Sequence, residues 1–317
     1  MPQTHLLRAA GLLPLLVLTT GAQAFTFENE DGTIRGSFDS TIAAGIGVRT
    51  QGPSCDLVVP GASGKGAPAG CLSPLAGVYD QGNLNYGKGD LFTGYFKGTH
   101  ELVLKLPSEV TVMARGTWLR DLAATHTTGI RSGLASVEGT DGLTGPARED
   151  LRFKARLLDL WVSKSFDVGG QSVRVRFGNQ VINWGESLYL GGGINATNSL
   201  DLQRLALPGT QLKEGLLPAP MISVASGLGN GLNIEGYYQF GWNKSYLPPV
   251  GSYWNTGYSL GTGNSAFGVH EAKAKNSGQW GLALKWQTPE STLNFGAYVL
   301  KYHDNLPQPR VHQNHFS

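Results

Sequence analysis

Residues that could carry out catalysis are sparse and lack the spacing of established catalytic motifs. The seven histidines are scattered, and no His-Glu-x-x-His pair occurs that could hold a catalytic zinc ion. Gly185-Glu186-Ser187 lacks the closing glycine of a nucleophile elbow, and Gly191-Gly192-Gly193 is not followed by the lysine of a phosphate-binding loop. Ser, His and an acid could still converge from distant segments, but no motif supports such a hydrolase. We therefore expect no enzyme, and no bound cofactor or metal.

The two cysteines, Cys55 and Cys71, flank one stretch rich in glycine and proline. In an oxidising compartment such a pair is more often a disulfide than a metal site or a nucleophile, and closing a loop of this size stabilises a protein by about 3 kcal/mol. A zinc site would need two further ligands, and none stands at a suitable spacing. We predict a disulfide between Cys55 and Cys71.

The run from Asp80 to Asp90 mixes Asp and Asn oxygens, the ligand type that calcium prefers. It departs from the calcium-binding loop of an EF-hand, since Asn85 replaces the glycine at the sixth position and Leu91 replaces the final Glu. We favour a structured loop without a metal ion.

The start of the chain has the layout of a secretory signal peptide: Arg8, an apolar segment through Leu18, and Ala22-Gln23-Ala24 as a small-residue cleavage site. Residues 1–24 are then the signal peptide, and the mature domain covers residues 25–317. Beyond this segment, no stretch approaches the ~20 apolar residues of a membrane helix. A net charge of +2 does not fit a nucleic-acid-binding protein, so no nucleic-acid partner is expected.

Apolar residues recur at every second position along much of the remaining chain, which is the period of a β-strand. In the clearest run, residues 32–50, Ile34, Phe38 and Ile42 share one face, whereas Arg35 and Asp39 share the other. Such a run exceeds the ~9–11 residues of a membrane-spanning strand. The alternation predicts nine strands, at residues 32–50, 96–106, 110–120, 156–166, 173–182, 221–227, 232–242, 280–287 and 292–302.

The connections between these strands are alternately long and short. The long ones cover residues 51–93, 121–154, 183–220 and 243–279, and the short ones are rich in Gly, Pro, Ser and Asn. Short turns on one side and long loops on the other are typical of outer-membrane β-barrels. Five aromatic residues near strand ends fit an interfacial girdle: Trp118, Trp242, Trp280, Trp286 and Tyr302.

Charged residues fall on the polar face of the predicted strands by parity. Isolated buried charges are too costly for a dry core, so we expect this face to line a water-filled lumen. Arg174, Arg176 and Glu235 are predicted pore-lining residues. The other charged residues of this face are Arg35, Asp39, Glu101, Lys105, Arg115, Asp159 and Lys285.

The connection at residues 183–220 is long enough to be functional in its own right. Asn198 or Ser199 is expected to cap a short helix through Leu207, which Pro208-Gly209 would stop. Two positions are open: the segment folds into the lumen, like the constriction loop of a porin, or it caps the rim. Its charged residues, which we predict to line or constrict a pore, are Glu186, Asp201, Arg204, Lys213 and Glu214.

Four motifs around this connection, RFGNQVINWGES, GGGIN, PGTQLKEGLLP and IEGYYQFGW, carry a family resemblance. The chain resembles the proteobacterial family of unknown function DUF1302, and the likeness extends to GSFDST and DQGNLNYGKGD. The resemblance implies a β-rich outer-membrane protein, in many cases encoded near exporter components of the resistance-nodulation-division type. It implies no established activity.

These patterns predict an all-β protein: an antiparallel up-and-down outer-membrane β-barrel with long extracellular loops. Because single-chain bacterial barrels have an even number of strands, nine strands followed by a proline-containing tail indicate an incomplete barrel, truncated at its C-terminus. We expect an outer-membrane channel, or the outer-membrane component of a transport or export system, for hydrophobic or aromatic compounds. The alternative is a non-conducting scaffold or loop-mediated binding protein. Expected partners are outer-membrane lipid and exporter components of the periplasm or inner membrane.

Overall fold

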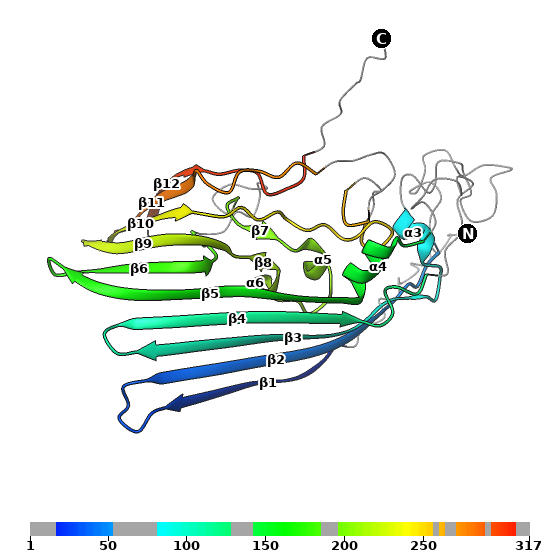
Figure 1. Ribbon diagram of the computed structural model, residues 1–317, viewed down its shortest axis with the longest axis horizontal. Helices are drawn as coiled ribbons and strands as arrows, with labels where there is room; N and C mark the ends of the chain where they lie inside the picture. The colour runs from blue at the N-terminus through cyan, green and yellow to red at the C-terminus, as the bar shows by residue number, and fades with distance from the viewer. Residues whose placement is uncertain are drawn as a thin grey trace, which may run out of the picture.

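One antiparallel sheet of ten strands accounts for most of the described chain (Figure 1). The structure is a computed structural model, and it describes residues 17–52, 81–127, 142–184, 196–255, 260–263, 271–288 and 293–308. Neighbours in the sheet follow the order β1-β2-β3-β4-β5-β6-β9-β10-β11-β12. The strands are β1 (Val17–Glu28), β2 (Arg35–Val48), β3 (Leu91–Leu106), β4 (Val110–Asp121), β5 (Phe153–Val168), β6 (Gln171–Gln180), β9 (Ala219–Gly229), β10 (Leu232–Gln239), β11 (Gln279–Gln287) and β12 (Asn294–Lys301).

All nine predicted strands are present, with shifted ends. The count of nine is one short, because β1 also belongs to the sheet and pairs with β2, from Glu28 opposite Arg35 to Val17 opposite Gly45. The backbone of β1 overlaps the end of the expected signal peptide. The apolar and small residues of 17–24 match a signal peptide and a strand equally well, so their alternation does not reveal the tenth strand.

The sheet is an up-and-down meander that does not close on itself. Its edges are β1 and β12, which do not pair with each other within the described residues. The expected all-β, antiparallel up-and-down fold is therefore confirmed, and the open sheet agrees with an incomplete barrel. The odd strand count from which the incomplete barrel was inferred is wrong, since the sheet has ten strands. The short turns after β3, β5 and β9 lie at one end of the sheet, and α3 (Gln81–Asn85) and α4 (Gly145–Arg152) lie among the long connections at the other (Figure 1).

Two of the short turns have the backbone of tight hairpins. Gly169 and Gly170 have φ of 64° and 81°, and Asn230 and Gly231 have φ of 49° and 77°. Two successive positive φ values are typical of the type I′ turn, whose twist matches that of the strands on either side. Glycine and asparagine adopt this conformation at the least cost, so these turns set the register of their hairpins.

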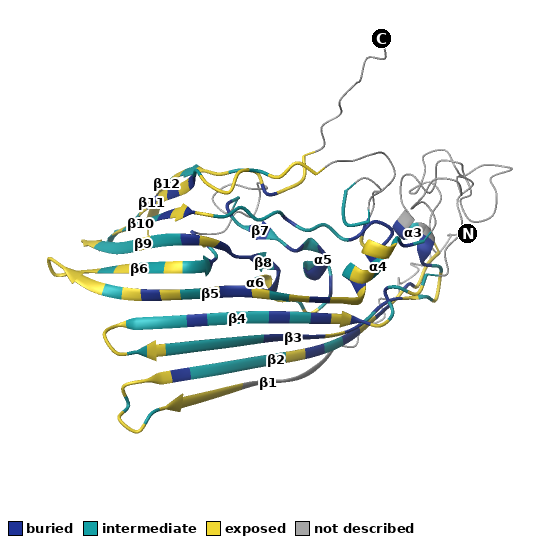
Figure 2. Cartoon of the chain, in the orientation of Figure 1, coloured by how far each residue is buried: buried dark blue, intermediate teal, exposed yellow. Residues whose placement is uncertain are grey.

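The two faces of the sheet differ in chemistry and in burial. Buried and exposed residues follow one another along single strands, as in β5 (Figure 2). On the outward face, apolar side chains are exposed; Ile46 is 52%, Phe177 56% and Phe295 54% exposed. On the inward face, charged side chains are buried; Lys97 is 2% and Asp159 6% exposed. This pattern is the inverse of the usual one, in which an antiparallel sheet buries its apolar face.

Near the middle of strand β5, the side chains that face inward change from even-numbered to odd-numbered positions. Leu158 and Asp159 both lie opposite Arg115 of β4, so two residues of β5 occupy the space of one. This β-bulge turns both side chains inward, where they are 1% and 6% exposed. Inward side chains therefore stand at even positions before the bulge, as at Arg156, and at odd positions after it, as at Trp161.

The connection between β6 and β9 spans residues 181–218. Its described residues, 181–184 and 196–218, are folded, and we call them the insert. It contains the short helices α5 (Leu202–Leu205) and α6 (Leu212–Gly215), and the strands β7 (Ser199–Leu200) and β8 (Leu216–Leu217), which pair with each other. In Figure 1 these elements lie alongside the strands, away from the short turns. Among the described residues, no helix has the length and apolar character needed to cross a membrane.

Candidate functional site on the inward face

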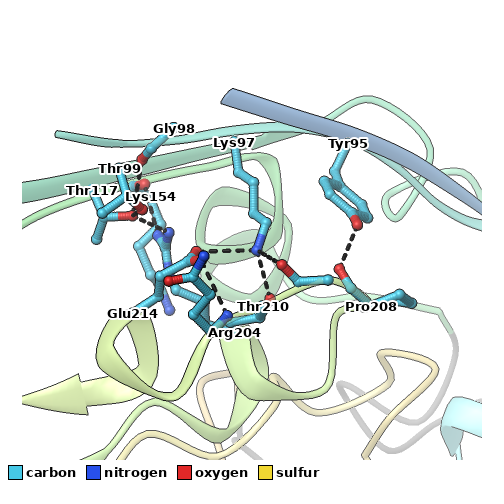
Figure 3. Close-up of polar contacts among 12 residues, drawn as sticks. Tyr95, Lys97, Gly98, Thr99, Thr117, Lys154, Arg204, Pro208, Thr210 and Glu214 are labelled. Carbon is cyan, nitrogen blue, oxygen red and sulfur yellow. Dashed lines mark hydrogen bonds and ion pairs between the residues drawn. The ribbon is translucent and has the colours of Figure 1, made fainter. Parts of the chain in front are cut away.

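Buried charged groups hold the insert to strand β3 (Figure 3). The Lys97 ammonium group donates to Glu214 Oε2 at 3.0 Å, to Thr210 Oγ1 at 2.9 Å and to Gly209 O at 2.9 Å. The side chains of Lys97 and Glu214 are 3% and 4% exposed. Three acceptors satisfy all three protons of the ammonium group, which offsets the cost of removing its charge from water.

The local fold of the insert positions Glu214 for this contact. Its other carboxylate oxygen, Oε1, accepts a hydrogen bond from the backbone N–H of Gln211 at 3.1 Å, at the start of α6. Nearby, the hydroxyl of Tyr95 donates to Pro208 O at 2.6 Å (Figure 3). Two side chains of β3, those of Tyr95 and Lys97, therefore fix the segment from Pro208 to Glu214.

Arg204 of α5 carries a positive charge into the interior, where it is 1% exposed. Its Nη1 donates to Thr117 Oγ1 of β4 at 2.7 Å, and its Nη2 donates to Lys154 O of β5 at 3.3 Å. Burial lowers the pKa of the guanidinium, and the carboxylates of Asp201 and Glu214 oppose that shift. Because arginine remains protonated in proteins, this charge is a permanent feature of the inward face.

Asp201 links α5 to strand β5. Its Oδ1 accepts from the Arg204 backbone N–H at 3.0 Å, and its Oδ2 accepts from Arg156 Nε at 3.0 Å. The Arg156 guanidinium in turn lies over the ring of Tyr246, 4.0 Å from the centroid. Asp201 is fully buried. Its two carboxylate oxygens serve different roles, one as the N-cap of α5 and the other as the partner of a strand arginine.

The expected helix cap at Asn198 or Ser199 is therefore wrong, because both residues have other partners. Asn198 accepts from the backbone N–H of Ile182 at 3.2 Å and donates to its carbonyl at 2.6 Å. Ser199 lies in β7, and its hydroxyl donates to Asn243 O at 2.6 Å. The helix starts later than expected and ends before Pro208, where the sequence predicts the stop.

A second group of ion pairs extends from the insert toward the short-turn end of the sheet. Lys213 of α6 pairs with Glu101 of β3. Glu101 also lies 3.4 Å from Arg115 Nε, and Arg115 Nη1 donates to Asp159 Oδ2 at 2.7 Å. Lys213 is 41% exposed, so this group lies at the boundary of the covered region.

The other end of the insert packs on β9 to β12 through apolar and aromatic side chains. Trp184 is 3% exposed, and its ring lies 5.3 Å from that of Tyr237 and 5.9 Å from that of Tyr298, between centroids. Thr197 shares a 2.7 Å hydrogen bond with the Tyr237 hydroxyl. The rest of this cluster consists of Ile182, Ala219, Met221, Ala283 and the partly buried Leu300.

The insert thus lies along the inward face, from β3 to β12. Of the two positions expected for this segment, its contacts match the one inside the sheet, because Lys97, Thr117 and Tyr237 lie within strands and not in loops at the rim.

The structure brings together four predicted site residues, Asp201, Arg204, Lys213 and Glu214. Arg174, Arg176 and Glu235 lie on the inward face as predicted, but nearer the short turns. Glu186, Cys55 and Cys71 lie outside the described residues.

Three charged side chains of the strands that contact the insert are missing from the charged residues predicted for the polar face: Lys97, Lys154 and Arg156. Lys97 lies within the predicted strand 96–106 and shares the parity of Glu101, so the alternation of β3 places it on the polar face. Lys154, which pairs with Asp150 at 2.7 Å and donates to Gln203 Oε1 at 2.6 Å, precedes the predicted strand. Its parity differs from that of Asp159 because of the β-bulge, so simple alternation does not place it inward.

The described part of the expected calcium-like run is folded. Asp90 accepts from the backbone N–H of Gly87 at 2.6 Å, and Asn85 donates to the carbonyls of Gly142 at 3.1 Å and Gly251 at 2.8 Å. These contacts join three long connections at the rim. In the described parts of the chain, no three His, Cys, Asp or Glu side chains cluster as metal ligands.

Fold and site together define an all-β protein, with an open up-and-down sheet that is apolar outside and carries a charged insert inside. Residues 6–317 match the family model described as protein of unknown function DUF1302, and the chain belongs to this family. No curated protein and no solved structure matches the chain.

Proposed function

We propose that this protein is an outer-membrane channel, or the outer-membrane component of a transport or export system. The observation that carries the proposal is the inverted burial of the sheet, with exposed apolar side chains outward and buried charges inward. Exposed apolar surface costs roughly 25 cal/mol per Å² in water, whereas a bilayer supplies an apolar solvent for it. The predicted signal peptide would provide the export that this location requires, and its cleavage after Ala24 would leave only residues 25–28 of β1 paired with β2.

The insert is proposed to narrow the passage along the inward face. It brings Asp201, Arg204 and Glu214 to the centre of that face and covers β9 to β12 with Trp184. Fixed charge in a narrow space of low dielectric strongly biases which solutes enter. Exporter components of the periplasm or inner membrane, which the family resemblance implies, are the partners we propose.

Cell fractionation tests the location. The protein produced in a Gram-negative host is expected to sediment with outer membranes in a density gradient. Recovery in the periplasmic fluid after osmotic shock would contradict the proposal.

Single-channel conductance in planar bilayers tests the function. Because Gln180 and Ala219 are cross-strand partners, residues 181–218 can be replaced by Asn-Gly, which forms a two-residue hairpin turn, without altering the β6–β9 register. This excision is expected to raise conductance above that of the unaltered protein. An Arg120→Gln variant, altered on the outward face opposite Phe96, keeps the insert and serves as the control, with conductance close to the original.

A non-conducting scaffold or binding protein is the second candidate, and the rim favours it. Asn85 ties three long connections together, and Trp254 is left 42% exposed beside Tyr253 and Phe92. A preformed rim with an exposed aromatic residue is suited to binding a partner. Absence of conductance both in the unaltered protein and in the excision variant would favour this candidate over a channel.

A further inference from the structure

Two arginines on the inward face lie outside the region that the insert covers. Arg174 and Arg176 are neighbours on one face of β6, about 7 Å apart along the strand. Their cross-strand partners are small: Ser165 and Ala225 flank Arg174, and Ser163 and Ser223 flank Arg176. Within the described residues, neither arginine forms an ion pair.

The carboxylates nearest to this pair in the sheet have other partners. Asp159 of β5 accepts from Arg115 at 2.7 Å. Glu235 of β10 lies one strand beyond Ala225 and faces Lys285 at 3.9 Å. The pair therefore keeps an excess of positive charge, in contrast to the insert region, where Lys97 and Arg156 each contact a carboxylate.

Arg176 is held in place while part of its hydrogen-bonding capacity stays unused. Its guanidinium lies 4.1 Å from the centroid of the Trp161 ring. Its Nε is buried and has no hydrogen-bond partner. A buried donor without a partner costs free energy, and a planar guanidinium fixed by stacking is preorganised to bind an oxyanion through two parallel hydrogen bonds.

We propose that Arg174 and Arg176 form a binding site for the oxyanion of a small solute, a carboxylate or a phosphate. This site rests on the proposed function. It adds to that function by naming anionic solutes as the class of solute that enters the inward face. Arg176 binds the oxyanion through its fork, and the exposed Arg174 attracts it and supplies a second contact. The cross-strand neighbours Ser223 and Ala225 add only small side chains beside the two arginines.

Isothermal titration calorimetry of the full chain in a neutral detergent tests the site. The probes are benzoate, its uncharged isostere benzamide, and inorganic phosphate. Saturable binding of benzoate or phosphate, without binding of benzamide, is expected, and the stronger anion identifies the source of the oxyanion. Arg174→Gln and Arg176→Gln should each weaken binding about tenfold or more, the effect of one lost charge-assisted hydrogen bond.

The matched control is Arg120→Gln, because Arg120 is an exposed arginine opposite Phe96 on the outward face, and its loss should leave binding unchanged. Arg176→Lys keeps the charge but loses the fork, so an intermediate affinity is expected. Arg174 is exposed, so Arg174→Gln gives a test that does not disturb the Trp161 contact.

The proposal is overturned if the unaltered protein binds neither anion saturably, or if the double Arg174→Gln, Arg176→Gln variant binds as well as the original. Calorimetry measures binding without transport. The oxyanion site and the channel can therefore be disproved independently of each other. A protein that binds anions but does not conduct contradicts the channel, whereas one that conducts without binding them contradicts only this site.

Discussion

The two ends of the insert are attached to the same face of the same sheet by different forces. Toward β3 to β5, the contacts are mainly polar and include two buried ion pairs, Lys97 with Glu214 and Arg156 with Asp201. Toward β9 to β12, the contact is apolar and centres on Trp184. A buried ion pair adds little net stability, but losing one partner is costly, whereas apolar packing stabilises in proportion to the area buried. The charged end therefore sets the position of the insert, and the aromatic end supplies more of the favourable free energy.

Removing one charge from the buried pair should have the largest effect. Lys97→Met leaves the Glu214 carboxylate buried without its cation, and we expect the free energy of unfolding to fall by about 3–5 kcal/mol. Urea titration in detergent, followed by tryptophan fluorescence, measures it. The double variant Lys97→Met, Glu214→Leu should recover most of this loss, and equal losses in the single and double variants would contradict the role given to the pair.

Overpacking the aromatic end should have a smaller effect. A Cβ atom at Gly281 would stand 2.4 Å from the Tyr237 ring and 2.7 Å from the Trp184 ring, so Gly281→Ala is expected to cost about 1–3 kcal/mol in the same titration. Gly236→Ala is the matched control, since its Cβ would meet no atom closer than 3.6 Å. If both variants unfold alike, the aromatic end is not packed as described.

Removing one hydrogen bond at the aromatic end should matter less. Tyr237→Phe deletes the hydroxyl that shares a 2.7 Å hydrogen bond with Thr197, at a cost of about 1 kcal/mol. Adding Thr197→Val to this variant should cost little more, because no polar group is then left without a partner. If the losses of unfolding free energy in the two single variants add up fully in the double variant, the Tyr237 and Thr197 hydroxyls do not interact.

The smallest effect is expected at the exposed edge of the charged end. Lys213→Gln removes an ion pair whose lysine is 41% exposed, and Glu101 keeps Arg115 as a partner. The cost should be below about 1 kcal/mol and should decrease further when salt is added. A loss as large as that of Lys97→Met would show that the exposed Lys213–Glu101 pair stabilises the fold as much as the buried Lys97–Glu214 pair.

Alternation predicts the sheet well because the outward face is apolar along each of the nine strands. It fails at β1, where a signal peptide and a strand share the same residues, and at Lys154, where the β-bulge reverses the parity. The partners of Asp201 and Glu214 depend on how the insert lies across β3 to β5. Local sequence carries no information on such a long-range register, so the charges were predictable but their pairing was not.

The β-bulge in β5 determines where this strand can lose a residue. In a regular strand, deleting one residue moves every residue beyond it to the opposite face. Here Leu158 is the extra residue, so its deletion would restore plain alternation and leave Lys154, Asp159 and Trp161 all on the inward face. Deleting Ser163 instead would turn the inward-facing polar side chains that follow it toward the apolar outward face of the sheet. Insertions and deletions that the fold tolerates within β5 are therefore expected to collect at this one position.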